Sequence, residues 1–98
     1  MKLKIAVCDD DLQWSERIRQ SISEYMCHVN QQCDIQVFES GEELCGAFHG
    51  SHSFDIVFLD VDMDEMDGME TAEMIRSRSN QVTIVFITGV VELSLIHI

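Results

Sequence analysis

The sequence IVFLDVDMDEMDG, residues 56–68, joins a run of apolar residues to a dense group of acids. Its first four residues are apolar and mostly β-branched or aromatic, which is typical of a strand buried on both faces of a sheet. Because carboxylates crowded together repel one another, the second half predicts that a cation binds among them. The acids are Asp60, Asp62, Asp64, Glu65 and Asp67.

The composition of the chain limits the classes of protein to which it can belong. Its 98 residues, 46% of them hydrophobic, suffice for one domain with a single core. The net charge of −12 argues against direct binding of nucleic acid or of an anionic membrane, whose phosphates would be repelled. No apolar run reaches the length of a membrane span and no signal segment is evident, so we expect a cytoplasmic protein. We therefore expect reduced thiols at Cys8, Cys27, Cys33 and Cys45, with Cys8 in a core strand.

Strand and helix patterns alternate along the chain. Apolar runs predict strands at residues 3–8, 34–38, 56–59 and 83–87, the second of them at an edge. Ser40 and Glu43 form a capping-box signature for the second helix. The alternation predicts an α/β fold, a doubly wound parallel sheet with helices on both faces. The apolar stripes of the first and third helices are Trp14, Ile18, Ile22, Tyr25, Met26 and Val29, and Met69, Ala72, Met74 and Ile75.

In a doubly wound sheet the functional site lies beyond the carboxyl ends of the strands. Asp9 and Asp10 follow the first predicted strand, Asp60 ends the third, and Thr88 follows the fourth. We expect these four side chains to converge at one edge, while Asp11 caps the first helix. Carboxylate oxygens suit Mg²⁺, and a carboxylate beside Mg²⁺ can attack phosphorus to give an acyl phosphate. The hydroxyl group of Thr88 is placed to bind a phosphoryl oxygen.

These residues, with the segments Met66-Asp67-Gly68 and Ile87-Thr88-Gly89, resemble the receiver domains of two-component response regulators. The similarity runs from about residue 3 to residue 89 and is greatest to regulators with a LytTR-type DNA-binding domain. It implies a flavodoxin-like receiver fold and phosphorylation by a sensor histidine kinase. It also implies control of transcription through an output domain outside this chain, and it allows a homodimer of the full-length protein.

The resemblance also implies roles for single residues. Asp60 would be the phosphoacceptor, and Thr88 the switch hydroxyl that binds the phosphoryl group. Mg²⁺ would be held by Asp9, Asp10 and Asp60 together with the backbone carbonyl of Asp62. Such a domain is not an enzyme in the usual sense, because it catalyses only its own phosphorylation and dephosphorylation.

Two features depart from the family pattern. Asp64 stands where receivers usually have proline, and no lysine follows Lys4, although receivers carry a functional lysine at the end of a fifth strand. We therefore expect residues 1–92 to be a receiver domain truncated before its last strand and last helices. The final residues, 93–98, read LSLIHI, which looks like the translation of a transposase adapter, and we expect them to be a non-native read-through tail. The fourth strand would then be an apolar edge that favours association.

Two other functions stay open. The segment FLDVDMD also resembles the first motif of haloacid-dehalogenase-type, Mg²⁺-dependent phosphatases, but here it closes the third strand and leaves Asp9 and Asp10 unexplained. A receiver that binds partners without being phosphorylated is the other alternative. An EF-hand is excluded, because Glu65 stands where that loop requires glycine. His49 and His52 are interpreted as solvated loop residues.

Overall fold

Four parallel strands and a short fifth strand form one sheet in the computed structural model, which describes residues 2–47, 54–61, 68–78, 81–88 and 94–97. The strand order is β2-β1-β3-β4-β5. Strand β2 therefore lies on one side of β1 and the later strands lie on the other, which places the topological switch point between β1 and β3. The predicted doubly wound α/β fold is confirmed. The elements in chain order are β1 (Lys2–Cys8), α1 (Leu12–His28), β2 (Gln32–Phe38), α2 (Gly41–Ala47), β3 (Ile56–Asp60), α3 (Gly68–Arg78), β4 (Thr83–Thr88) and β5 (Ser94–His97).

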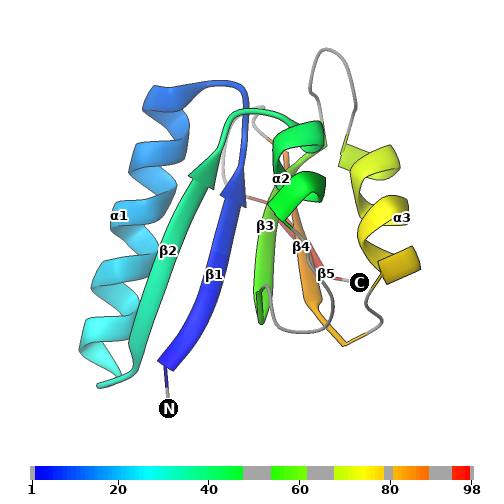
Figure 1. Ribbon diagram of the computed structural model, residues 1–98. Coiled ribbons are helices and arrows are strands. Elements are labelled where there is room, and N and C mark those ends of the chain that lie inside the picture. Colours follow the sequence, from blue (N-terminus) through cyan, green and yellow to red (C-terminus); the bar gives the residue numbers. More distant parts are fainter. Residues whose placement is uncertain (1, 48–53, 62–67, 79–80, 89–93, 98) are drawn as a thin grey trace.

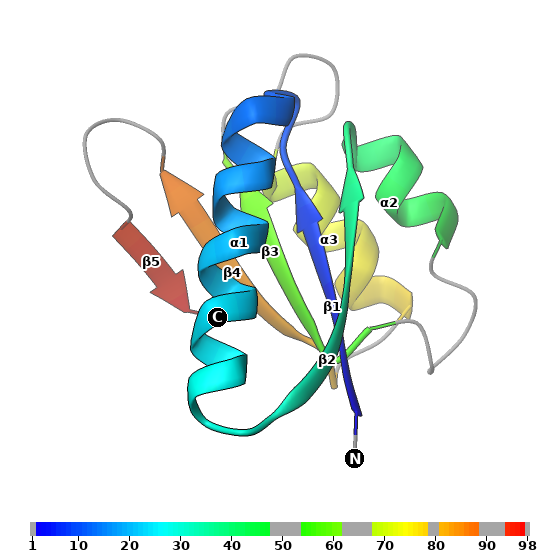
Figure 2. The same ribbon diagram turned by 90° about the vertical axis from the view of Figure 1, so that its left-hand side faces the viewer.

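The helices cover both faces of the sheet. Helix α1 lies against one face, and α2 and α3 lie against the other (Figures 1 and 2). Alternate residues of the central strands divide between the two cores, as the two-residue period of a strand requires. The α1 core is built around Val7, Ile18 and Ile87, and the α2/α3 core includes Ala6, Cys8, Leu44, Val57, Leu59, Ala72, Ile75, Ile84 and Phe86.

The predicted helix caps are confirmed. Asp11 precedes α1 in an extended conformation, and its side chain accepts hydrogen bonds from the backbone N–H groups of Gln13 and Trp14. Ser40 precedes α2, and its hydroxyl oxygen accepts a hydrogen bond from the Glu43 N–H at 3.1 Å. Both side chains satisfy backbone donors that a helix leaves without internal partners, so each fixes where its helix begins.

The prediction that the fourth strand forms an edge of the sheet is wrong. Strand β5 pairs with it in antiparallel direction, from Val85 opposite His97 to Thr88 opposite Ser94. From Val85 to Thr88, the side of β4 that faces away from β3 is thus paired with backbone rather than exposed. The apolar residues at the end of the chain have the composition of a strand, which explains the pairing. The assignment of residues 93–98 as a read-through tail stays a prediction.

The apolar stripes predicted for the first and third helices are too wide, because some of their outer residues are exposed. Tyr25 and Val29 of the first stripe are 63% and 46% exposed, and Met69 and Met74 of the third are 51% and 37% exposed. Ile18, Ala72 and Ile75, which lie at the centres of the stripes, are buried as predicted. None of the described helices is both long and apolar enough to cross a membrane.

Candidate metal-binding site

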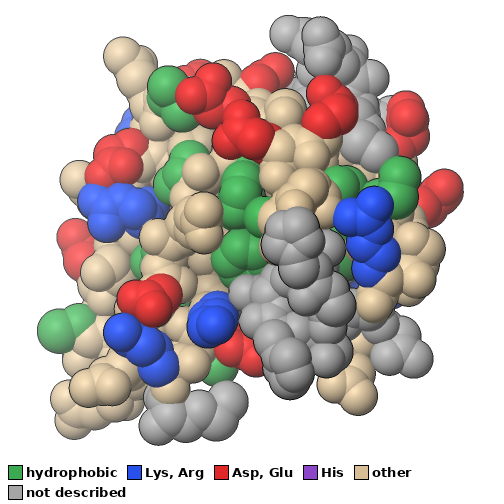
Figure 3. All heavy atoms as spheres, viewed as in Figure 1, with side chains coloured by type: hydrophobic (Ala, Val, Ile, Leu, Met, Phe, Trp, Pro, Cys, Tyr) green, Lys and Arg blue, Asp and Glu red, His purple; other side chains and the backbone are tan. Residues whose placement is uncertain are grey.

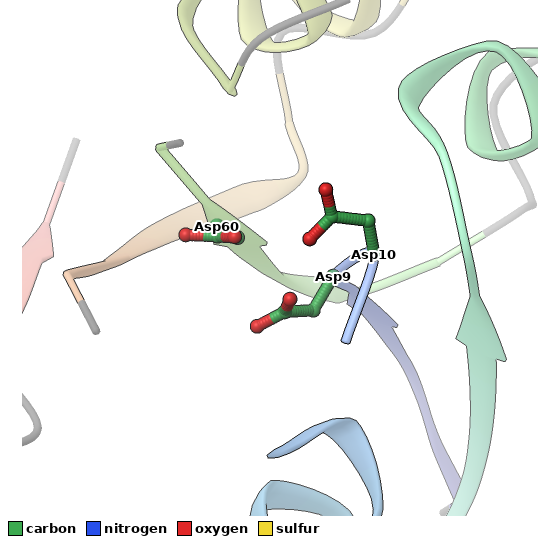
Figure 4. Close-up of side chains that lie close together, drawn as sticks. All are labelled: Asp9, Asp10 and Asp60. Atoms are coloured by element: carbon green, nitrogen blue, oxygen red, sulfur yellow. The ribbon is translucent and has the colours of Figure 1, made fainter. Parts of the chain in front are cut away.

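Three carboxylates meet at the carboxyl edge of the sheet. Asp9 and Asp10 directly follow β1, and Asp60 is the last residue of β3 (Figure 4). Parallel pairing of Cys8 with Leu59 brings both strands to this edge in step. One oxygen from each carboxylate lies within 4.8 Å of the other two. The structure thus brings together three of the residues that the sequence singled out.

The backbone and side chain of Asp9 are held by several hydrogen bonds. Its N–H donates to the carbonyl oxygen of Phe38 at 3.1 Å, which ties the end of β1 to β2. Its carboxylate oxygen Oδ1 accepts from the N–H of Asp11 at 2.9 Å, and its carbonyl oxygen accepts from the hydroxyl of Ser15 at 3.4 Å. Ser15 is fully buried. The sequence reading missed its contribution, although Ser15 lies next to Trp14 and three residues before Ile18, on the buried face of α1.

Burial and a second carboxylate oppose ionisation of Asp9. Asp9 is 3% exposed and Asp60 is 9% exposed. The pKa of Asp9 is raised to about 7, above all by burial and further by the charge of Asp60 and a hydrogen bond with it, while the hydrogen bond from Asp11 acts in the opposite direction. A divalent cation would favour the ionised form and remove this repulsion.

Negative charge also surrounds the cluster. Figure 3 shows acidic side chains along the upper side of the molecule, where β1 and β2 end in the view of Figure 1. A surface of one sign raises the local concentration of oppositely charged ions. The exposed acids near the ends of these strands and the start of α2 are Asp10, Asp11, Glu39, Glu42 and Glu43.

The donor set fits Mg²⁺. All three residues offer carboxylate oxygens, the hard ligands that this ion prefers, and Asp10 is exposed while Asp9 and Asp60 are buried. Such a site has one side open to solvent, which suits an ion that keeps several of its waters and binds phosphate. Zn²⁺ is less well matched, because the cluster contains no imidazole or thiolate ligand.

Other predicted site residues are placed only in part. Thr88 is the last residue of β4, so its backbone lies at the same edge as Asp60, and its side chain is outside the described part of the structure. The predicted Asp62 carbonyl ligand also lies outside the described residues. The same holds for Asp64, Glu65, Asp67, His49 and His52.

Cys8 lies beside the cluster as a core residue. It is 1% exposed, and burial raises the pKa of its thiol to about 12, with the charge of Asp9 adding to the effect. A thiol that stays protonated is a poor nucleophile and a poor metal ligand. All four cysteines lie in the described residues as thiols, in agreement with the sequence reading.

Comparison with known proteins places the chain in a family. Residues 5–97 match the response regulator receiver domain model. Response regulator proteins VraR of Staphylococcus saprophyticus and Staphylococcus epidermidis are 30% and 31% identical to the chain over 94 residues. These alignments cover 94% of this chain and 42% of each relative, so the chain spans less than half the length of these proteins.

Solved structures agree with this match. The receiver domain of AraT, a response regulator from Geobacillus stearothermophilus, is 30% identical with a TM-score of 0.71, covering 90% of this chain and 65% of that one. The BeF3-activated receiver domain of DrrB, a Thermotoga maritima protein, is 26% identical with a TM-score of 0.66, covering 94% and 70%. The chain therefore belongs to the response regulator receiver domain family.

Proposed function

We propose that Asp60 accepts a phosphoryl group from a phosphohistidine of a sensor histidine kinase. The observation that carries this proposal is the cluster of Asp9, Asp10 and Asp60 at the carboxyl edge of the sheet, in a chain of the receiver family. The output would be control of transcription through a DNA-binding domain of the longer protein. The VraR response regulators extend well beyond the aligned segment, which covers 42% of their length, and this leaves room for such a domain.

The reaction is a direct transfer between two side chains. A carboxylate oxygen of Asp60 attacks the phosphorus atom and forms a new P–O bond as the P–N bond to the histidine breaks. The electron pair of that bond leaves with the imidazole nitrogen, and Asp60 becomes an acyl phosphate. Water later attacks this phosphorus and releases inorganic phosphate, which restores the carboxylate. The domain thus catalyses only its own phosphorylation and dephosphorylation.

Asp9, Asp10 and Asp60, with the backbone carbonyl of Asp62, are the residues proposed to hold Mg²⁺. When bound, Mg²⁺ neutralises charge on the oxygens of the phosphoryl group that is transferred. The chain itself orients the nucleophile, because Asp60 ends the central strand β3 and is itself buried. Asp9 is fixed by its three hydrogen bonds before any ion arrives.

Thr88 is proposed as the switch residue. It ends β4 beside Asp60, and a hydroxyl there would bind a phosphoryl oxygen and shift a two-state equilibrium that the output domain senses. No lysine follows Lys4 within these 98 residues, so the functional lysine of the family is not among them. The LytTR type of output domain, a cytoplasmic location and a homodimer of the full-length protein are further parts of this proposal.

Phosphorylation by acetyl phosphate tests the assignment of Asp60. The chain is incubated with acetyl phosphate and Mg²⁺, and its intact mass is measured with and without EDTA. We expect one added phosphoryl group that depends on Mg²⁺ and that is lost in Asp60→Asn. Asp34→Asn is the matched control, because Asp34 is an exposed acid of β2 whose side chain pairs with Lys2.

Each contrary result has a definite meaning. A phosphoryl group that persists in Asp60→Asn means that another residue is the acceptor. Rapid multiple turnover of a small phosphate ester would support the phosphatase alternative instead. Mg²⁺-dependent binding of BeF3⁻ without any phosphorylation would show an intact pocket and leave only the binding-module function.

A further inference from the structure

Asp11 connects the start of α1 to the carboxylate cluster through two different parts of the residue. Its side-chain oxygen Oδ1 accepts from the N–H groups of Gln13 and Trp14 at 3.0 and 3.2 Å, which caps the helix. Its own backbone N–H donates to Oδ1 of Asp9 at 2.9 Å. The residue that caps α1, Asp11, is therefore hydrogen-bonded directly to the proposed metal ligand Asp9.

Ser15 closes these hydrogen bonds into a ring. Its N–H donates to the carbonyl oxygen of Asp11 at 2.9 Å, and its hydroxyl donates to the carbonyl oxygen of Asp9 at 3.4 Å. Ser15 is 0% exposed, so no water competes for the hydroxyl. Asp9, Asp11 and the first turn of α1 thus hold one another in a single arrangement.

We propose that Asp11 is a positioning residue for divalent-cation binding. By capping α1, its side chain keeps the Asp11 N–H directed at one oxygen of Asp9, so that the carboxylate is already oriented when the cation arrives. The inference rests on the proposed Mg²⁺ role of Asp9 and adds a residue that does not touch the ion. Groups that orient a metal ligand in this way typically change metal affinity by about 10- to 100-fold when they are removed.

The negative charge of Asp11 is the competing explanation. Asp11 is exposed, and a carboxylate near the cluster attracts cations whether or not it caps the helix. The two effects separate by substitution. Asparagine caps a helix about as well as aspartate but carries no charge, whereas alanine supplies neither cap nor charge. Salt at about 0.15 M screens the contribution of an exposed charge.

Isothermal titration calorimetry of Mg²⁺ binding at about 0.15 M NaCl distinguishes an effect of the helix cap from an effect of the Asp11 charge. We expect Asp11→Ala to raise the dissociation constant about tenfold and Asp11→Asn to change it by about twofold or less. Ser40→Ala is the matched control, because it removes the cap of α2 without a hydrogen bond to the cluster, and it should leave Mg²⁺ affinity unchanged. Thermal unfolding without Mg²⁺ verifies that each variant is folded.

A second variant keeps the test decisive if Asp11→Ala is too unstable to measure. Glycine at a cap position costs only a few tenths of a kcal/mol in helix stability and supplies no side-chain acceptor, so Asp11→Gly should also bind Mg²⁺ several-fold more weakly. Equal weakening in Asp11→Asn and Asp11→Ala would mean that charge alone acts and would overturn the proposal. Wild-type affinity in both Asp11→Ala and Asp11→Gly would overturn it as well. If the unsubstituted chain bound no Mg²⁺, the metal site and this inference would both be wrong.

Discussion

Gly68 lies directly against the backbone of Asp60. A Cβ atom added to Gly68 would lie 2.3 Å from the Asp60 carbonyl oxygen and 2.7 Å from the α-carbon of Val61. The Gly68 N–H donates to the carbonyl oxygen of Val61 at 3.3 Å. The first residue of α3 is therefore packed onto the residue that carries the proposed phosphoacceptor carboxylate. Both neighbours in this contact are backbone, so neither can turn away as a flexible side chain would.

We expect Gly68→Ala to destabilise the domain and to weaken Mg²⁺ binding together. Overpacking against rigid neighbours typically costs about 1–3 kcal/mol in the free energy of unfolding, and here the displaced atoms belong to Asp60 and Val61. Urea denaturation measures the first effect and Mg²⁺ titration the second. Gly46→Ala is the control, because a Cβ at Gly46 of α2 would meet nothing within 4 Å. It should leave Mg²⁺ binding unchanged and stabilise the helix by up to about 1 kcal/mol. Equal stability of the two variants would contradict the close contact.

The ionisation of Asp9 should make the ion-free domain less stable as the pH rises. The folded-state pKa of about 7 lies above the ordinary value of 3.8, so between these values the folded state binds more protons than the unfolded state. The stability that Asp9 contributes is therefore fully present below about pH 4 and is lost as the pH rises through about 7. At about 1.4 kcal/mol per pH unit over about three units, the loss is at most about 4 kcal/mol. Urea denaturation in EDTA between pH 4.5 and 8 measures it.

Asp9→Asn supplies the control for this pH dependence. The asparagine does not titrate, so the decline in stability attributed to Asp9 should disappear in this variant. Mg²⁺ favours the ionised carboxylate, so its stabilising effect on the unsubstituted chain should grow over the same interval and be largely lost in Asp9→Asn. A parallel decline in both proteins would assign the pH dependence to other groups.

The cysteines should react with alkylating reagents in an order set by burial. Cys27 is exposed, whereas burial raises the pKa of both Cys8 and Cys45 and keeps them protonated. Iodoacetamide at pH 8 should therefore modify Cys27 quickly and leave Cys8 and Cys45 unmodified until the chain unfolds. Peptide mass mapping after short labelling measures the order, and labelling in urea shows that every thiol is competent. Rapid native labelling of Cys8 would mean that the end of β1 opens.

Asp55 should stabilise the end of the sheet opposite the carboxylate cluster, where β3 and β4 begin. Its side-chain oxygen Oδ2 accepts a hydrogen bond from the Lys4 N–H at 2.9 Å. Its own N–H donates to the Lys4 carbonyl oxygen at 2.7 Å, and its carbonyl oxygen accepts from the Thr83 N–H at 3.0 Å. Asp55→Ala removes the first of these bonds and should cost about 1 kcal/mol in the free energy of unfolding. Asp34→Ala removes an ion pair with Lys2 in which both side chains are more than half exposed, and it should cost less. Equal losses would mean that the Lys4 bond contributes no more than a surface ion pair.

The sheet and the position of the acids were predictable because each depends on a pattern local to a strand. The apolar run at residues 56–59 ends in Asp60, and the run at residues 3–8 ends just before Asp9. Once both runs are parallel strands of one sheet, their carboxyl ends share an edge and the carboxylates must meet. The caps Asp11 and Ser40 were predictable for the same reason, since capping depends on residues only two or three positions apart.

Features that depend on distant contacts were not predictable. Tyr25 and Met74 lie beside buried positions on their helices, and only the placement of each helix on the sheet decides that they are exposed. The pairing of β5 with β4 requires the chain to turn back, which no local pattern indicates. The bond from the Asp11 N–H to Asp9 involves a backbone group, which every residue except proline carries, so residue identity gives no signal of it.

The carboxylate cluster depends on the register in which β1 and β3 pair, with Cys8 opposite Leu59. Side chains on a strand alternate between faces, so slipping β3 by one position against β1 would carry Asp60 to the opposite side of the sheet from Asp9. The same slip would turn Val57 and Leu59 out of the α2/α3 core. A misaligned sheet would therefore lose the proposed cation site and much of its core together. Tight Mg²⁺ binding by a purified sample would therefore indicate that β1 and β3 are paired in the correct register.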